Sequence, residues 1–283
     1  MIVDFHVHVF PPEIKADRSR WLASDATFAE LYQSPKARVA TAEDVLRSMD
    51  TAGIDISVMQ GFAWTDPEAC CRHNDVLLEA AARDPARLVA YCTLSPSTSA
   101  EAAGDEAERC VAAGGRGFGE LRPDGQGYSG RWECLAKVAS VASASGTPLL
   151  VHASEPVGHL YPGKGAMYPA ELMALVRHFP GVTWVLAHLG GGLPFYAAMP
   201  EVREALRNVY VDTAAWSLLY GPQVFAALSE TMGSERILFA SDFPLQAQGP
   251  SVERMRQLPL DSIAIEAMLG GNAGALLRRG DGR

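Results

Sequence analysis

The amino-acid sequence predicts an α/β fold, a single (β/α)8 TIM barrel over residues 1–283 with an irregular insertion after the first strand. Short apolar, β-branched runs alternate with longer Ala-, Leu- and Glu-rich runs, which is the pattern of repeated βαβ units. Most of the short runs are apolar without alternation, as strands buried on both faces of a parallel sheet are. Polar residues end several runs, including the first and the last, and those two strands are neighbours only in a closed barrel.

The elements follow one another in a regular order along the chain. We expect strands at 2–5, 56–60, 88–94, 117–121, 149–152, 183–187, 209–212 and 237–241. Helical patterns lie at 42–53, 67–84, 99–113, 131–145, 169–178, 196–206, 217–231 and 260–278. An open doubly wound sheet is the alternative, but no G-x-G-x-x-G fingerprint follows the first strand. Two connections, 11–41 and 153–168, have no clear period, and long loops commonly form active-site walls.

Composition and charge exclude several classes of protein. The chain has 283 residues, 48% of them hydrophobic and 20% charged, a balance typical of globular rather than disordered or coiled-coil proteins. Its formal net charge is -9 and no stretch is rich in basic residues, so we expect no nucleic-acid partner and no membrane binding. The longest apolar stretch, 182–199, is interrupted by His188 and Pro194, which argues against a membrane span.

The cysteines and the first residues indicate the compartment. The five cysteines include no CxxC pair, and Cys70 is adjacent to Cys71, so a reducing compartment explains them most simply. The chain enters its first strand without the basic start and apolar stretch of a signal peptide. We therefore expect a cytoplasmic protein that acts on a small-molecule substrate, and the sequence leaves a homo-oligomer open.

Four histidines and one aspartate stand at the ends of predicted strands. His6 and His8 end the first strand, where side chains two residues apart point to the same side and can reach one ion. His152, His188 and Asp242 follow the fifth, sixth and eighth apolar runs. Each alone could be structural, as a hydrogen-bonded core histidine or a helix cap. Together they predict a metal site at the carboxyl-terminal face of the barrel, since neutral imidazole binds Zn, Fe and similar ions.

Three motifs carry a resemblance to a known superfamily. They are VDFHVHVFPP at 3–12, AHLGG at 187–191 and ASDFP at 240–244. In this order they resemble the amidohydrolase superfamily. The closer likeness is to the amidohydrolase-related branch that includes aminocarboxymuconate-semialdehyde decarboxylase and many metal-dependent hydrolases. The resemblance covers nearly the whole chain, and it is specific for superfamily and metal but not for substrate.

The resemblance also implies roles for the residues at the strand ends. His6, His8, His152 and Asp242 resemble metal ligands, and His188 resembles the residue that orients or deprotonates the metal-bound water. We expect a divalent metal, zinc in the first place, with Mn²⁺ or Fe²⁺ as alternatives. Asp242 can also carry a proton, so Asp242 and His188 are the expected catalytic residues.

Glu120, at the end of the fourth apolar run, raises the question of a second ion. Many binuclear members of the superfamily carry a carboxylated lysine at this strand end, but the lysines here, Lys15, Lys36, Lys137 and Lys164, do not end strands. Glu120 resembles instead the bridging glutamate of TatD-like nucleases. We expect one ion, with Glu120 either binding it or supporting one of its ligands. A purely structural alternative is that Glu120 pairs with Arg122.

Two reactions and one non-enzymatic role are compatible with these residues. A divalent metal lowers the pKa of bound water from 15.7 towards about 7, so the first expectation is hydrolysis of an ester, lactone or amide bond of a small molecule. The alternative is non-oxidative decarboxylation of a small unsaturated carboxylic acid, for which the branch uses near-identical ligands. A closed structural metal site is the third possibility, and the position of the ligands at the barrel face argues against it.

The substrate is expected to contact residues that follow the strands. Arg122 comes after the fourth strand, and Trp64, Tyr128 and Trp216 lie beyond the second, fourth and seventh. An aromatic wall with a cation suits a small planar or carboxylate-bearing molecule. Each residue also has a structural alternative: the tryptophans can cap the core, and Arg122 can pair with Glu120.

Overall fold

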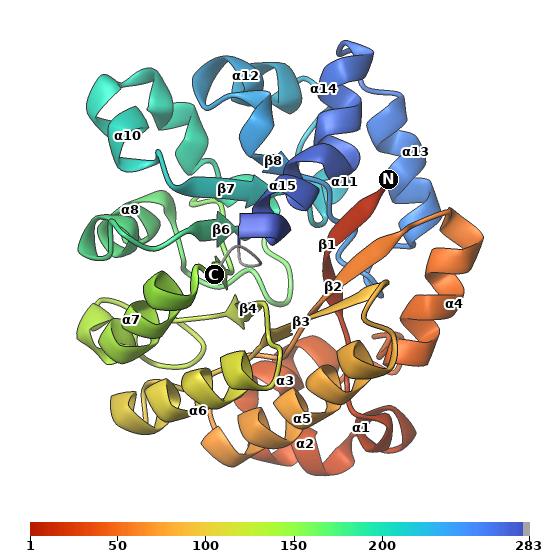
Figure 1. The fold of residues 1–283 in the computed structure, drawn as a ribbon, viewed down its shortest axis with the longest axis vertical. Helices are drawn as coiled ribbons and strands as arrows, with labels where there is room; N and C mark the ends of the chain where they lie inside the picture. Colours follow the sequence, from red (N-terminus) through yellow and green to blue (C-terminus); the bar gives the residue numbers. More distant parts are fainter. Residues whose placement is uncertain (280–283) are drawn as a thin grey trace.

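Eight parallel strands form the centre of the protein and pair in the order of the chain, from β1 to β8 (Figure 1). Backbone hydrogen bonds from Phe5 N to Phe239 O (2.8 Å) and from Asp242 N to His6 O (3.0 Å) close the sheet into a barrel. The predicted (β/α)8 fold is thus confirmed over residues 1–279, the part described by the structure, a computed structural model. The strands are β1 (Val3–His8), β2 (Ile56–Gln60), β3 (Leu88–Cys92), β4 (Gly117–Leu121), β5 (Leu149–Val151), β6 (Trp184–Leu186), β7 (Val209–Asp212) and β8 (Ile237–Leu238).

Helices surround the barrel on all sides (Figure 1). The helices between and after the strands are α4 (Ala42–Ala52), α5 (Pro67–Arg83), α6 (Ala100–Ala112), η1 (Trp132–Leu135), α7 (Ala136–Ser145), α8 (Pro169–His178), α9 (Ala187–Gly190), η2 (Leu193–Ala198), α10 (Pro200–Ala205), α11 (Trp216–Leu219), α12 (Val224–Thr231), η3 (Ser234–Arg236), α13 (Gln248–Arg256), α14 (Ser262–Glu266), η4 (Ala267–Gly271) and α15 (Asn272–Arg279). None of the helices within residues 1–279 has the length and apolar character needed to cross a membrane.

The insertion after the first strand is more regular than predicted. It holds α1 (Pro12–Ala16), α2 (Ser19–Ser24) and α3 (Ala26–Tyr32). These helices have at most seven residues, too few for a helical apolar period to be recognised. The Asp25 side chain caps α3 by accepting a hydrogen bond from Phe28 N at 2.9 Å. Helix α13 was also missed, because Gly249 and Pro250 argue against a helix although proline is tolerated in a first turn.

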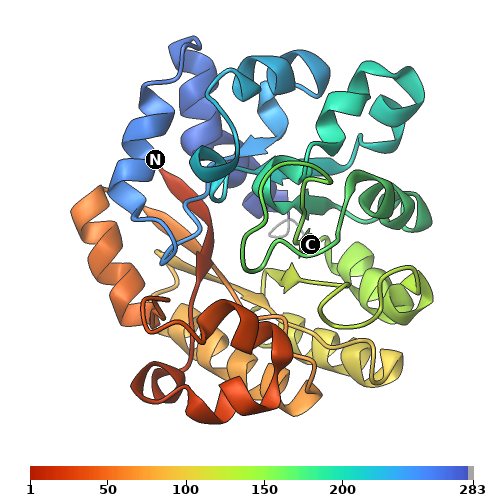
Figure 2. The same cartoon turned by 180° about the vertical axis from the view of Figure 1, so that it is seen from behind.

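The insertion and the long loop after β5 lie on the same side of the barrel. Figure 2 shows the red helices of the insertion and the green loop 153–168 on the near side. A hydrogen bond from Gly163 N to Glu30 Oε1 (2.8 Å) joins the loop to α3. At the opposite end of the barrel, Leu276 of α15 packs against the interior side chains of Val3 and Phe5. The two long connections therefore surround the carboxyl-terminal mouth, and α15 closes the amino-terminal end.

A β-bulge in β1 directs its two histidines into the barrel. The pairing of β1 with β2 shifts by one residue between Asp4 and Val7. Phe5 packs in the barrel interior, whereas Val7 packs in the outer layer between strands and helices. A bulge adds one residue and re-aims the side chains that follow it. His6 and His8 consequently both face inward at the carboxyl-terminal mouth.

A second irregularity, in β4, places Glu120 opposite them. The register with β5 shifts between Phe118 and Leu121, and both of these side chains pack in the outer layer. Glu120 lies between them and points inward. Gly119 is required at this point because a Cβ would lie 2.8 Å from the Leu150 Cβ, closer than side chains approach.

Candidate metal centre

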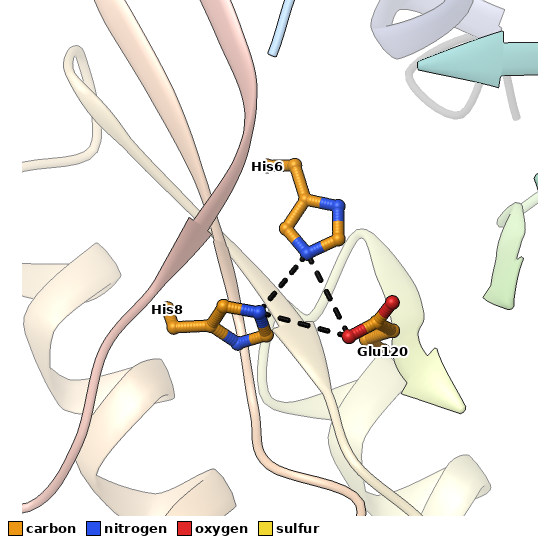
Figure 3. A group of neighbouring side chains, drawn as sticks. All are labelled: His6, His8 and Glu120. Carbon is orange, nitrogen blue, oxygen red and sulfur yellow. Dashed lines mark hydrogen bonds and ion pairs between the residues drawn. The ribbon is translucent and has the colours of Figure 1, made fainter. Parts of the chain in front are cut away.

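Three side chains from β1 and β4 converge at the mouth of the barrel (Figure 3). The Nε2 atoms of His6 and His8 lie 3.2 Å apart. Glu120 Oε2 lies 3.8 Å from the first and 3.6 Å from the second. Asp242 Oδ1, which follows β8, lies 3.4 Å from His8 Nε2. The structure thus brings together side chains from the first, fourth and eighth strands, as expected for residues predicted at the carboxyl ends of barrel strands.

The other two predicted histidines approach the opposite oxygen of Glu120. His152 Nδ1 lies 2.9 Å from Glu120 Oε1, and His188 Nε2 lies 3.6 Å from the same oxygen. Both histidines are more than nine-tenths buried. Glu120 does not pair with Arg122: the ion pairs that Arg122 makes are with Glu30 and Asp124. The carboxylate of Glu120 therefore stands at the middle of a ring of four imidazoles.

Asp212 is a part of the site that the sequence analysis missed. It is fully buried at the end of β7, and its Oδ2 accepts a hydrogen bond from His6 Nδ1 at 2.8 Å. Its Oδ1 accepts from the backbone N–H groups of His188 and Ala214, both at 3.0 Å. The available signal was its place at a strand end, the same place that singled out the other site residues.

The backbone is left-handed at two of the predicted site residues. His188 has φ +55° and Asp242 has φ +64°, a region that side chains other than glycine seldom adopt. At His188, the backbone N–H donates a hydrogen bond to Asp212 Oδ1, and the side-chain Nδ1 lies 3.0 Å from the carbonyl oxygen of Ala214. These two contacts hold the strained turn. Strain of this kind persists only where the surroundings impose it, and it clusters at functional sites.

Buried carboxylates dominate the electrostatics of the site. Burial alone would lower the pKa of His6, but the charges of Asp212 and Glu120 outweigh it and raise the pKa to about 9. For His188, burial is likewise outweighed by the hydrogen bond to Glu120 and the charge of Asp242, and the pKa is raised to about 10. Burial would raise the pKa of Asp242, but the contact with His8 and the nearby histidines lower it to about 2. The site therefore attracts positive charge.

The donor atoms fit a divalent cation. Metal bonds to imidazole nitrogen and carboxylate oxygen are about 2.0–2.2 Å long, so donors on one ion lie roughly 3–4 Å apart. The donor atoms of His6, His8 and Glu120 lie 3.2–3.8 Å apart, and Asp242 Oδ1 lies 3.4 Å from His8 Nε2. His8 Nδ1 is buried and has no hydrogen-bond partner within residues 1–279, so no protein group at Nδ1 fixes the tautomer of this ring. Imidazole and carboxylate donors together suit Zn²⁺, Mn²⁺ and Fe²⁺.

Arg122 is a buried cation with unused donors. Its side chain is 8% exposed, and the nearest carboxylates, on Glu30 and Asp124, are 3.8 and 3.7 Å away. Its Nε and Nη1 atoms have no hydrogen-bond partner in the described part of the chain. Buried donors without partners are costly, which makes this side chain a candidate for contact with an anionic ligand.

The predicted aromatic residues lie in the core. Trp64 packs against Phe28, and its Nε1–H donates a hydrogen bond to His73 Nδ1 at 2.9 Å. Tyr128 is fully buried, and Trp216 packs edge-on against Phe225. These side chains are packed in the core, as the structural alternative expects, rather than along an open wall that a substrate could contact. Direct contact of Trp64, Tyr128 or Trp216 with a substrate stays a prediction.

Two tyrosines from the long connections are closer to the charges of the site. Burial raises the pKa of Tyr32, on α3, and the charges of Asp242 and Glu120 raise it further. Burial, Glu155 and Asp242 raise the pKa of Tyr161, in the loop after β5. The sequence held no signal for either residue, because both lie in segments without a recognisable period.

Comparison with known proteins places the chain in a family. A family model described as Amidohydrolase matches residues 3–279. A search of curated proteins finds no match. Among solved structures, 5-carboxyvanillate decarboxylase of Sphingomonas paucimobilis is 19% identical with a TM-score of 0.76, and the match covers 98% of each chain.

Two further solved structures are also decarboxylases. The 2,6-dihydroxybenzoate decarboxylase of Rhizobium is 22% identical with a TM-score of 0.72, over 99% of each chain. The dihydroxybenzoic acid decarboxylase of Polaromonas sp. JS666, which holds manganese and the inhibitor 2-nitroresorcinol, is 20% identical with a TM-score of 0.73, over 98% of this chain and 96% of that one. The prediction of hydrolysis as the main reaction is therefore wrong, since these similar structures favour the alternative, decarboxylation. The chain is an enzyme that belongs to the amidohydrolase superfamily.

Proposed function

We propose that the protein is a divalent-metal-dependent, non-oxidative decarboxylase of a small aromatic or otherwise unsaturated carboxylic acid. The observation that carries this proposal is the convergence at the barrel mouth of His6, His8 and Glu120, whose donor atoms lie 3.2–3.8 Å apart, with Asp242 Oδ1 at 3.4 Å from His8. The similar structures named as decarboxylases of aromatic acids support the choice of reaction. The ion would be held by His6, His8 and Asp242, with Glu120 beside them.

The identity of the metal follows from the donors and the comparison. We place Mn²⁺ ahead of the zinc that the sequence first suggested. The site offers two carboxylates, which suit manganese, and the similar Polaromonas enzyme holds manganese. A bound divalent cation supplies Lewis-acid chemistry, polarising the substrate oxygens beside the bond that breaks.

The reaction needs a proton delivered to carbon. The bond between the ring or alkene carbon and the carboxylate breaks, its electron pair stays on that carbon, and CO2 leaves as a proton takes its place. Asp242 and His188 are the proposed proton carriers. His188 contacts the Ala214 carbonyl through Nδ1, so only its Nε2 faces the site and can exchange a proton there.

Arg122 is the proposed anchor of an anionic substrate. Two donors of its buried guanidinium have no hydrogen-bond partner within residues 1–279, and a carboxylate or phenolate oxygen would satisfy them. The variant Arg122→Met keeps an apolar stem of similar length. It should raise KM by at least about tenfold with a smaller change in kcat, as expected for loss of one charge-assisted hydrogen bond.

The reaction is tested by measuring CO2. Purified protein is freed of metal with a chelator, reloaded with Mn²⁺ or Zn²⁺, and incubated with a panel of hydroxybenzoic acids and carboxylated phenols. We expect CO2 release that requires the metal and is lost in Asp242→Asn. The control His178→Asn removes an exposed imidazole at the C-terminal end of α8, which belongs to none of the groups described above, and should retain activity. CO2 release that persists undiminished without metal would contradict the proposal, as would metal-loaded protein that releases acid from lactones but no CO2.

A further inference from the structure

Three polar side chains from the loops at the carboxyl-terminal face of the barrel have a role that the proposed reaction does not use. Glu155 lies three residues beyond His152, Tyr161 lies further along the same loop, and Tyr220 follows α11. The Tyr161 hydroxyl donates a hydrogen bond to Glu155 Oε2 at 3.5 Å. Glu155 Oε1 and the Tyr220 hydroxyl are buried and have no hydrogen-bond partner within residues 1–279. Buried polar atoms of this kind are costly to leave unpaired, so they call for a partner.

Two glycines in the turn after β6 bring Glu155 and Tyr220 together. A Cβ at Gly191 would lie 2.8 Å from the backbone nitrogen of Ser154, so this turn rests directly on the chain that leads into Glu155. A Cβ at Gly192 would lie 3.8 Å from the Tyr220 hydroxyl oxygen. Burial raises the pKa of Tyr220, and the nearby charge of Glu155 raises it further, so the hydroxyl stays protonated. An acceptor and a donor, both unpaired, are therefore neighbours.

Lys164 holds the loop that carries Tyr161 in one shape. Its side chain is 7% exposed, and its Nζ donates hydrogen bonds to the carbonyl oxygens of Val157 at 2.8 Å and His159 at 3.0 Å. The same ammonium lies 5.8 Å from the centre of the Tyr161 ring, within the range of a cation–π contact. Because these contacts are present without a ligand, the loop pays little ordering entropy when a ligand binds.

The Tyr161 hydroxyl connects Glu155 with the metal centre. Burial and the charge of Glu155 raise the pKa of Tyr161, the charge of Asp242 raises it further, and Arg122 opposes the shift. Tyr161 therefore lies close enough to feel the centre, Glu155 and the proposed anchor Arg122. At the centre itself, the side chains of His8 and Glu120 are 14% and 13% exposed, so the site is open to solvent.

We propose that Glu155 and Tyr220 form a specificity site, which binds a hydroxyl group of the substrate remote from the carboxylate that is lost and rejects a second carboxylate. This inference rests on the proposed function, which supplies the acid. A hydroxyl group both donates and accepts, so a single one satisfies Glu155 Oε1 and the Tyr220 hydroxyl together.

Other substituents satisfy the specificity site less well. A methoxy group has no hydrogen to donate to Glu155, and an ammonium group has no lone pair to accept from Tyr220. A second carboxylate would face the negative charge of Glu155, and such a juxtaposition of like charges is the usual means of rejecting a wrong ligand. The substrate class is therefore a small monocarboxylic acid with a neutral hydroxyl group.

Binding of non-reacting analogues tests the specificity site independently of activity. Mn²⁺-loaded protein is titrated calorimetrically with phenylphosphonates, which keep an anionic group and cannot lose CO2, carrying a hydroxyl, methoxy or carboxylate group at position 3 or 4. We expect the hydroxy compound to bind at least about tenfold more tightly than the other two, as for one hydrogen bond to a charged group. In Glu155→Gln, the preference over the carboxylate compound should fall by at least about tenfold. The control Glu201→Gln, which removes an exposed carboxylate from α10, should leave all three affinities unchanged.

Tyr220→Phe provides a second test that does not depend on the folding of Glu155→Gln. Loss of the Tyr220 donor should weaken the hydroxy and methoxy compounds by a similar factor, because both accept a hydrogen bond. Unchanged affinities for both compounds in this variant would overturn the proposal.

The remaining outcomes separate the specificity site from the reaction. Equal affinities for the three compounds in the wild-type protein, or no binding of any of them, would overturn the specificity site and leave water as the partner of Glu155 and Tyr220. An unchanged preference in Glu155→Gln would do the same. If CO2 is still released from the acids of the panel, the proposed function stands in each of these cases. The expected affinities without CO2 release from any acid would instead overturn the proposed reaction and support the specificity site.

Discussion

Asp212 controls which nitrogen of His6 carries hydrogen, and the variant Asp212→Asn tests this role. In the wild-type protein the carboxylate accepts from His6 Nδ1 at 2.8 Å, so the Nε2 lone pair faces the centre. Asparagine has the same shape, and its carbonyl oxygen can still accept the two backbone N–H groups of His188 and Ala214. Its NH2 group would then face His6 Nδ1 and force the proton to Nε2. The variant should therefore fold while presenting the wrong tautomer to the metal.

The size of the effect follows from what is lost. A carboxylate that orients a metal-binding histidine contributes about 10–100-fold in metal affinity. This corresponds to about 1.4–2.7 kcal/mol of binding free energy. The charge-assisted hydrogen bond itself contributes about 1.5–3 kcal/mol to stability, so the free energy of unfolding should fall by a similar amount. Because Asp212 is fully buried, solvent does not weaken this contact.

Calorimetric titration with Mn²⁺ and urea unfolding of the metal-free protein measure the two quantities. Asp4→Asn is the matched control, since Asp4 is equally buried but holds the side chains of Ser241 and Gln248 rather than an imidazole. The control should lose stability with a smaller loss of metal affinity. The reasoning fails if Asp212→Asn binds Mn²⁺ as tightly as the wild-type protein, or if both variants lose affinity equally.

Three further results are expected. Asp242→Asn should lower kcat by about 10²–10⁴-fold and weaken metal binding far less, measured by initial rates and Mn²⁺ titration; a variant with normal kcat would move the proton transfer to His188. Because His6 and His188 have raised pKa values of about 9 and 10, the stability they confer on the metal-free protein is complete below about pH 6.5 and is lost as the pH rises through 9–10. Thermal unfolding should show the Tm falling over this window, and an unchanged Tm would count against the charge assignment. Gly119→Ala should cost about 1–3 kcal/mol in urea unfolding, because the new Cβ would meet Leu150 at 2.8 Å; a fully stable variant would refute the crowding of β4.

The order of the barrel and most of the side chains that gather at its mouth were readable from the sequence. Continuous apolar runs predict strands buried on both faces, because the hydrophobicity of each residue indicates whether its side chain is buried. The same runs end in His6, His8, His152, His188 and Asp242, so the position of a polar residue after an apolar strand was sufficient to find them. In a parallel barrel the carboxyl ends of all strands lie at one face, so residues that follow different strands in the sequence lie together in one site.

The reaction was harder to read, because the ligands serve more than one chemistry. The donors predicted at the strand ends are compatible with both hydrolysis and decarboxylation, and the first choice made from the residues was wrong. What distinguishes the two is the shape and charge of the substrate pocket. Tyr32 and Tyr161 lie near the charged centre only because α3 and the loop after β5 fold over the mouth. Neither segment has a pattern that predicts such a position.

What the sequence determined by itself is the succession of strands and helices and the set of donors at the strand ends. Only the tertiary structure decided how those donors face one another. The bulge in β1 turns His6 and His8 inward, and the register shift in β4 sets Glu120 between two groups of histidines. Asp212 acquires its role through a partner more than two hundred residues away in the chain. Register shifts and hydrogen bonds of this kind arise from the packing of neighbouring strands, and no local pattern of residues encodes them.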